Sequence, residues 1–308
     1  MSAALEAMQG QPPEQNSVYL TQSENDPPEP EGSFFNQQIA LPAEWLPPIN
    51  LLSADIRYLL ADEKFKKNRI DLALEYTDYL RSRITPGQYQ FGDPEYVHSQ
   101  IAPRLFLDSI ALMLNQQVYH TLSAKKGRHS PDTFGDLLRL LETKRTMQVG
   151  ISDYVKEFPD TSGDILFNNL LGMMNHARRV VYTDEVTTEK TKNSNMQNLI
   201  GMLAENKVVD ALQKNDWPGT CHASISQDAI GVDVIVPTEK HGSAVVLQVK
   251  SHRLETTDFA IKPEFGTPRV IVPMNPRYNN PFRLDDLATN LLNKFIYNAP
   301  RVRLSLAA

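Results

Sequence analysis

The chain has 308 residues, 41% of them hydrophobic, so it is long enough to bury a core and to hold about two domains. Its single cysteine, Cys221, excludes an internal disulfide and a four-cysteine zinc site, and it favours a reducing, cytoplasmic location. No apolar run approaches the roughly 18 residues that cross a bilayer, so we expect no membrane association.

The first 48 residues form an acidic, proline-rich segment that we expect to be a disordered tail. The segment has no Lys or Arg and too little apolar surface to offset the entropy of ordering. Two interpretations stay open: a solvated terminus, or an arm that binds a protein partner. The tail accounts for the whole net charge of −6 through seven carboxylates: Glu6, Glu14, Glu24, Asp26, Glu29, Glu31 and Glu44.

The next region, residues 49–190, is predicted to be an all-α domain, because apolar residues recur at spacings of three and four. We expect four to six helices, among them a long one from Tyr96 to Ser123 that Pro103 delays or kinks. Another should follow Ser130 and Pro131, and a third should cover Ile165 to Val181. The region carries no phosphate-binding loop and no hydrolase motif, so the sequence predicts architecture here without chemistry.

A polar stretch at residues 187–195 predicts a linker, and the pattern changes after it. A helix from Met196 to about Asn215 should precede three strands, in CHASIS, GVDVIVP and SAVVLQVKS. A fourth strand, in PRVIVPM, should lead to a last helix that buries Leu284, Leu287, Leu291 and Phe295. This order predicts an α+β domain over residues 191–308, built on a mixed sheet.

Polar residues interrupt two of these apolar strands. Strand alternation puts Asp233 on a face with Gly231 and Ile235, leaves the other face to Val232, Val234 and Val236, and points Gln248 and Lys250 to one face. An antiparallel hairpin with Val236 opposite Val245 would bring Asp233 to roughly 5 Å from Gln248 at Cβ. A fourth candidate, the acid Glu205, lies on the inward stripe of the preceding helix, between Met202 and Val209.

A carboxylate among valines is costly unless a partner compensates for its lost hydration, and a cation would do so. Asp233, the Gln248 amide oxygen and the Val249 carbonyl suit Mg²⁺ or Mn²⁺, with Glu205 as an auxiliary ligand or water-orienting base. Lys250 would stabilise charge on a phosphate. The alternatives are an edge-strand charge for Asp233, a solvated strand face for Gln248 and Lys250, and a snorkelling Glu205.

The series Glu205, then GVD ending at Asp233, then QVKS from Gln248 to Ser251, resembles the PD-(D/E)xK nuclease superfamily. It is most similar to the Mrr-like branch, in which glutamine replaces the second acid. The resemblance covers residues 191–308. It implies a restriction-endonuclease-like mixed sheet flanked by helices, with Asp233 as principal metal ligand, Gln248 as second ligand, Lys250 as catalytic lysine and Glu205 as first-helix acid.

The leading hypothesis is therefore a Mg²⁺-dependent nuclease that hydrolyses phosphodiester bonds by a metal-activated water. DNA is preferred to RNA only through the resemblance, and a homodimer would allow both strands to be cut. The alternative is an inactive nuclease-fold module that binds nucleic acid or assembles with proteins. A third hypothesis makes the helical region an interaction scaffold.

Overall fold

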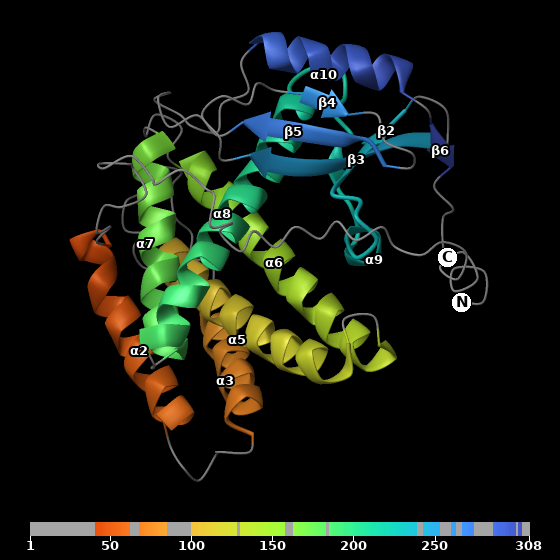
Figure 1. Ribbon diagram of the computed structural model, residues 1–308. Helices are drawn as coiled ribbons and strands as arrows, with labels where there is room; N and C mark the ends of the chain where they lie inside the picture. The colour runs from red at the N-terminus through yellow and green to blue at the C-terminus, as the bar shows by residue number, and fades with distance from the viewer. Residues whose placement is uncertain are drawn as a thin grey trace. The chain divides into compact units, whose positions relative to one another are not determined.

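The computed structural model describes residues 41–61, 68–84, 100–127, 130–157, 163–182, 185–238, 243–252, 260–262, 267–273, 286–299 and 301–303. The chain divides into two compact units, residues 1–38 and 39–308, and every described residue belongs to the second. This second unit is an α+β structure, as predicted from the sequence. In it, a series of helices precedes a mixed sheet (Figure 1).

The described helices are η2 (Ala43–Trp45), α2 (Leu46–Ala61), α3 (Arg69–Arg83), α5 (Ala102–Lys126), α6 (Pro131–Glu157), α7 (Gly163–Val181), α8 (Glu185–Gln213), α9 (Ile225–Asp228) and α10 (Asp286–Asn298). The described strands are β1 (Cys221–His222), β2 (Val234–Pro237), β3 (Ser243–His252), β4 (Ala260–Lys262), β5 (Arg269–Pro273) and β6 (Val302–Arg303). None of the described helices has a stretch both long and apolar enough to span a lipid bilayer.

Helix α5 is the core of the helical region, and it packs against α3, α6 and α7. Most of its residues are buried on all sides, including Leu105, Phe106 and Ile110. Pro103 occupies the first turn of α5, where its missing N–H costs no intrahelical bond. Gln100 and Ile101 are already in π-helical conformation, and residues 96–99 lie outside the described residues, so the expected delay of the helix start stays a prediction. Helices α6 and α7 begin within two residues of the expected positions.

The expected disordered tail is wrong at its C-terminal end. Helix η2 and the start of α2 lie within residues 41–48, and residues 1–40 are outside the described residues. Trp45 is only 2% exposed, and its ring meets that of Tyr154 edge-on at 5.5 Å between centroids. Pro47 and Pro48 fit the first turn of α2 for the same reason as Pro103 in α5. The aromatic anchor therefore extends the fold beyond the predicted boundary.

The expected linker at residues 187–195 is also wrong as a local structure, because α8 runs without interruption from Glu185 to Gln213. The polar stretch contains Glu and Lys, which are good helix formers, and it lacks Gly and Pro. A helix can therefore continue through it without an apolar face. The division into domains at residue 190 stays a prediction.

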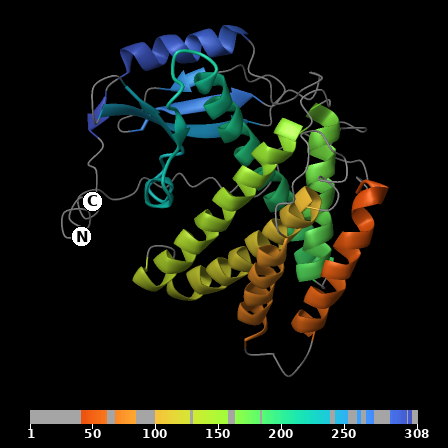
Figure 2. The ribbon, with the colours of Figure 1, turned by 180° about the vertical axis from the view of Figure 1, so that it is seen from behind.

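The sheet has the strand order β1-β2-β3-β5-β4, and β6 pairs with one end of β3. Strands β3 and β5 are parallel, whereas the other pairs are antiparallel (Figures 1 and 2). The CHASIS run was expected to be a strand, but the strand ends at His222. Ser224 and Gln227 form a capping box that starts the single turn α9, which ends the strand. Strands β4 and β6 were not predicted.

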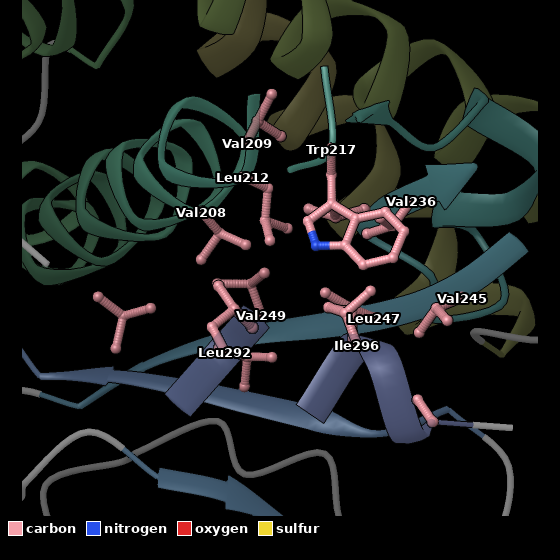
Figure 3. Packing of buried hydrophobic residues seen from close by; sticks show 14 of the residues in the cluster. Val208, Val209, Leu212, Trp217, Val236, Val245, Leu247, Val249, Leu292 and Ile296 are labelled. Carbon is pink, nitrogen blue, oxygen red and sulfur yellow. The ribbon is translucent and has the colours of Figure 1, made fainter. Parts of the chain in front are cut away.

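One face of the sheet is covered by both α8 and α10 (Figure 3). Val234, Val236, Val245, Leu247 and Val249 project from β2 and β3 toward the two helices. Trp217 lies between the sheet and the helices, with its ring centroid 5.0 Å from that of Tyr297 on α10. The main core of the C-terminal region thus lies on a single face of the sheet.

Two expectations about buried faces are wrong. In α10, Leu292 and Ile296 are fully buried and Leu291 is 46% exposed, so the centre of the stripe is shifted by one residue, whereas Phe295 is partly buried against the core as expected. Leu284 and the side chain of Leu287 lie outside the described residues. Val232 was expected beside Val234, but it packs on the opposite face with Ile235. Residues 231–233 precede β2 and are not in strand conformation, so alternation does not hold for them.

Candidate functional site

The hairpin of β2 and β3 has the predicted register, with Val236 opposite Val245. Asp233 lies one residue before β2 and continues the pairing, because its N–H donates to the Leu247 carbonyl at 2.9 Å. Its side chain turns to the strand edge, where Oδ2 accepts the backbone N–H of Val249 at 2.7 Å. Asp233 is 6% exposed, so it is not a solvated edge-strand charge.

Gln248 lies beside Asp233, as expected, but its oxygen is already bonded. Its Oε1 accepts a hydrogen bond from Nε of Arg269, on β5, at 3.1 Å. Its Nε2 lies toward Gly231, where a Cβ would approach it to 3.0 Å. The φ of +86° at Gly231 turns the chain just before Asp233, which favours glycine at this position. The half-buried amide of Gln248 thus fits against the backbone of this turn.

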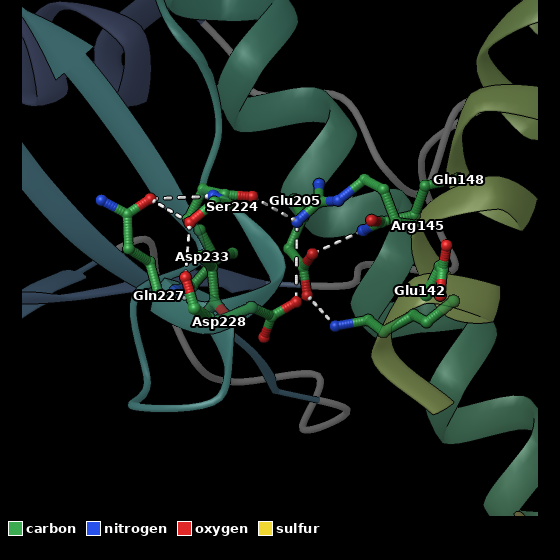
Figure 4. Close-up of polar contacts among 12 residues, drawn as sticks. Glu142, Arg145, Gln148, Glu205, Ser224, Gln227, Asp228 and Asp233 are labelled. Carbon is green, nitrogen blue, oxygen red and sulfur yellow. Dashed lines mark hydrogen bonds and ion pairs between the residues drawn. The ribbon is translucent and has the colours of Figure 1, made fainter. Parts of the chain in front are cut away.

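Glu205 is buried at 4% exposure on the inward side of α8, as its position between Met202 and Val209 predicts. Its oxygens have partners on α6: Nζ of Lys144 lies 2.8 Å from Oε1, and Nε2 of Gln148 donates to Oε2. Figure 4 shows Gln148 reaching Glu205 across the space between the two helices. A helix of the N-terminal region therefore contributes directly to the site.

Asp228 is a further acid in this group, carried by the short helix α9. Nη2 of Arg145, on α6, lies 3.5 Å from Oδ2 of Asp228 and also donates to the carbonyl of Ala223 at 3.1 Å (Figure 4). The capping box at Ser224 starts α9 and so positions Asp228 one turn later. Through these two contacts, Arg145 connects the segment that contains α9 to α6.

The pKa values of the two buried acids, Asp233 and Glu205, are shifted in opposite directions. Burial first, and then the charge of Glu205, raise the pKa of Asp233 to about 7, although Lys144 and Lys250 oppose the rise. Burial also raises the pKa of Glu205, but Lys144 and Gln148 outweigh it and hold that pKa below its usual value. Glu205 is therefore the ionised partner near neutral pH, and Asp233 is the acid that exchanges a proton there.

Two more titratable groups face the acids. Burial and the positive charge of Arg145 lower the pKa of His222, on β1, to about 4, so this histidine is neutral at pH 7. Lys250 is exposed near the end of β3, and its charge acts on both Asp233 and Asp228. The lysine therefore presents a positive charge at the exposed side of a buried acidic group.

The structure thus gathers Asp233, Gln248, Lys250 and Glu205, with the Val249 backbone between them. The N–H and C=O of one strand residue point to the same edge, so the Val249 carbonyl faces the side on which Asp233 lies. Among the described residues, no three His, Cys, Asp or Glu side chains form a group that could hold a metal ion by themselves. An ion here would need amide or carbonyl oxygens as well.

Sequence reasoning missed the contribution of α6, since the helical region was predicted to carry no chemistry. Lys144 and Gln148 are four residues apart and therefore share a helix face, which Met147 and Ile151 extend into the core. A lysine and a glutamine beside buried apolar residues on one face were the available signal. Asp228 had no signal, because it lies between the CHASIS and GVDVIVP runs, in a segment that the sequence assigned to no element.

Comparisons with protein-family models, with curated proteins and with solved structures found no match.

Proposed function

We propose that this chain is a metal-dependent nuclease that hydrolyses phosphodiester bonds in DNA, and that residues 191–308 have a restriction-endonuclease-like fold. The observation that carries the proposal is the placement of two buried acids, Asp233 and Glu205, behind one exposed lysine, Lys250. Two buried acids whose charges repel each other destabilise a fold, but they favour the binding of a cation between them. The mixed sheet and the helix that carries Glu205 support the proposed fold.

The residues present fit Mg²⁺ or Mn²⁺ in their chemistry, because they offer hard oxygen donors. Asp233, Glu205 and the Val249 carbonyl would hold the ion. Burial and, after it, the negative charge of Glu205 raise the pKa of Asp233, and a bound cation would offset both effects. Oε1 of Gln148 is buried beside Glu205 with no hydrogen-bond partner among the described residues, so it is a further oxygen donor for a cation or its waters.

Gln248 fits the ligand set less well than the sequence suggests. Its Oε1 is bonded to Arg269, so the amide must turn before its oxygen can face Asp233. We therefore assign Gln248 as a ligand only after this rearrangement. Its present contact gives it a second role, since it holds the guanidinium of Arg269 at the edge of the site.

Each protein group has a separate task in the proposed reaction. When bound, the ion would polarise a phosphoryl oxygen and lower the pKa of a bound water. Asp233 would hold the ion as a carboxylate, so the proton that it carries with a pKa of about 7 in the metal-free protein is released when the ion binds. Lys250 is exposed and can donate to a phosphate oxygen, which stabilises the charge that develops there. A homodimer would supply two sites, one for each strand of the DNA.

A second candidate is an inactive module with the same fold that binds nucleic acid or assembles with proteins. The specific observation in its favour is that protein donors already satisfy both oxygens of Glu205 and the Gln248 oxygen. This candidate predicts DNA binding that divalent ions do not change and no cleavage with any ion.

The deciding experiment incubates the purified full chain with supercoiled plasmid, and separately with single-stranded RNA, in Mg²⁺, Mn²⁺ or EDTA. Asp233→Asn and Lys250→Ala are compared with Lys294→Ala, which removes an exposed lysine from α10 and leaves the site residues unchanged. We expect metal-dependent nicking by the wild type and by Lys294→Ala. The two site variants should lose roughly 100-fold or more, in line with the loss of one catalytic group.

Each failure has its own meaning. Cleavage that persists in Lys250→Ala and Asp233→Asn would come from another site or from a contaminant, and it would remove the assigned residues. DNA binding without any cleavage would favour the inactive module. RNA cleavage without DNA cleavage would change the substrate and keep the site.

A further inference from the structure

Lys144 of α6 places a positive charge inside the acidic group of the proposed metal site. Its Nζ lies 2.8 Å from Oε1 of Glu205, and its side chain is 22% exposed against 5% for that of Glu205. Burial lowers the pKa of this lysine, but the charges of Glu205, Asp228 and Asp233 raise it above its usual value. Carboxylates from three separate segments therefore act on one ammonium group.

Even with all three of its acids ionised, the acidic group around Glu205 holds no excess negative charge without a metal ion. A neutral His222 also faces the group and adds no charge near pH 7. A divalent ion entering this set would bring excess positive charge into a poorly solvated place, so one cation must move away. The group contains three acids and three bases: Glu205, Asp228 and Asp233 against Lys144, Arg145 and Lys250.

Lys144 is the cation best placed to leave. Arg145 is tied to two acceptors, the Asp228 carboxylate and the Ala223 carbonyl. Lys250 is exposed and does not occupy an oxygen of Glu205 among the described contacts. Lys144 is bonded to Glu205 directly, is partly exposed, and has a flexible four-carbon stem that can carry its charge into solvent.

We propose that Lys144 is a built-in cation that competes with the divalent ion for the Glu205 carboxylate and so sets the occupancy of the metal site. The inference rests on the proposed function, because the site is the same one. Without the ion, the ammonium neutralises Glu205 and stabilises the junction of α6 and α8. When the ion binds, Lys144 moves out and Glu205 becomes available as a ligand.

The test measures Mn²⁺ binding to the full chain by titration calorimetry, without DNA. Lys144→Met removes the charge and keeps an unbranched apolar stem, so the Kd for Mn²⁺ should fall about 10-fold. Lys156→Met is the matched control, because Lys156 lies on the same helix, is 67% exposed and pairs only weakly with Asp153 at 3.9 Å. The control should bind as the wild type does. The double variant Lys144→Met, Glu205→Gln should lose the gain.

A second measurement uses the wild type and does not depend on the folding of a variant. Lysine acetylation is followed by mass spectrometry with and without Mn²⁺, and Lys144 should react several-fold faster with the ion, whereas Lys156 should not change. Unchanged or weaker Mn²⁺ binding by a folded Lys144→Met, or unchanged reactivity of Lys144, would overturn the inference.

These outcomes are separate from those of the cleavage assay. A gain in Mn²⁺ binding by Lys144→Met without DNA cleavage by any form keeps the inference and removes the nuclease function. Cleavage by the wild type without that gain keeps the function and removes the inference.

Discussion

Val249 donates its backbone N–H to Oδ2 of Asp233 over 2.7 Å, which joins a buried acid to the neighbouring strand. The backbone N–H of Asp233 in turn donates to the carbonyl of Leu247 on the same strand at 2.9 Å. The acid is thus held by the main chain of β3 through both its backbone and its side chain. Changes in protonation should therefore alter its charge more than its position.

The pH dependence of stability should reveal the buried charge of Asp233. Burial, then Glu205, raise its pKa from 3.8 to about 7. A group whose pKa is higher in the folded state stabilises the fold at low pH, and this contribution is lost as the pH rises through the folded-state value. Asp233→Asn keeps an acceptor for Val249 but cannot ionise, so above pH 7 it should be more stable than the wild type by about 2 kcal/mol.

The measurement is urea unfolding of both forms at about pH 4, close to the unfolded-state pKa of 3.8, and at about pH 8. The advantage of Asp233→Asn should be small at the lower pH and large at the higher one. Asp71→Asn, at an exposed position on α3, is the control and should differ from the wild type equally at both pH values. An Asp233→Asn variant that is less stable than the wild type at the higher pH would contradict the pKa shift.

Gly231→Ala should destabilise the fold by about 1–2 kcal/mol, because φ at this residue is +86° and L side chains are strained there. The new Cβ would also lie 3.0 Å from Nε2 of Gln248, but that amide can move. Gly219→Ala is the control, since its Cβ would make ordinary contacts with Pro237 at 3.6 Å or more. Thermal melting measures the loss of stability in both variants. Equal losses would show that the positive φ at Gly231 is not the cause of the destabilisation.

The central part of the site could be predicted because local rules determine it. A short turn between two strongly apolar strands sets the register of β2 and β3, and this register brings Asp233 to Gln248. The helical spacing of the neighbouring apolar residues is enough to predict that Glu205 is on the buried side of its helix. The α+β class follows from the same order of helices and strands. These inferences need only neighbours in sequence or one hairpin.

The rest depends on long-range packing, which no local pattern contains. Lys144 meets Glu205 only because α6 crosses α8, and Arg269 reaches Gln248 only because β5 pairs with β3. The wrong stripe in α10 has a similar cause, since Leu291 and Leu292 both continue an apolar series with a spacing of four. Packing against the sheet determines which series is buried, and it is the one that contains Leu292 and Ile296.

Gly150→Ala should destabilise the crossing of α5 and α6 by roughly 1–2 kcal/mol. A Cβ at this position would lie 2.9 Å from Cδ2 of Leu105, which is 1% exposed and has little room to move. Gly201→Ala in α8 is the control, because its Cβ would meet nothing within 4 Å and alanine is the better helix former. Chemical unfolding should show opposite signs, with a gain of about 0.5–1 kcal/mol for the control. A stabilised Gly150→Ala would show that the two helices are not in close contact.

Leu292→Ala and Leu291→Ala are adjacent in α10 and identical in chemistry, so they isolate the effect of burial. Leu292 is fully buried against the sheet, and its truncation should cost about 2–5 kcal/mol through lost burial and an unfilled cavity. Leu291 is 46% exposed, so its truncation should change stability by less than about 0.5 kcal/mol. Urea unfolding of the two variants gives the difference directly. A larger loss for Leu291→Ala would mean that α10 presents the face predicted from the sequence, and the packing of α10 beside Trp217 would have to be rebuilt.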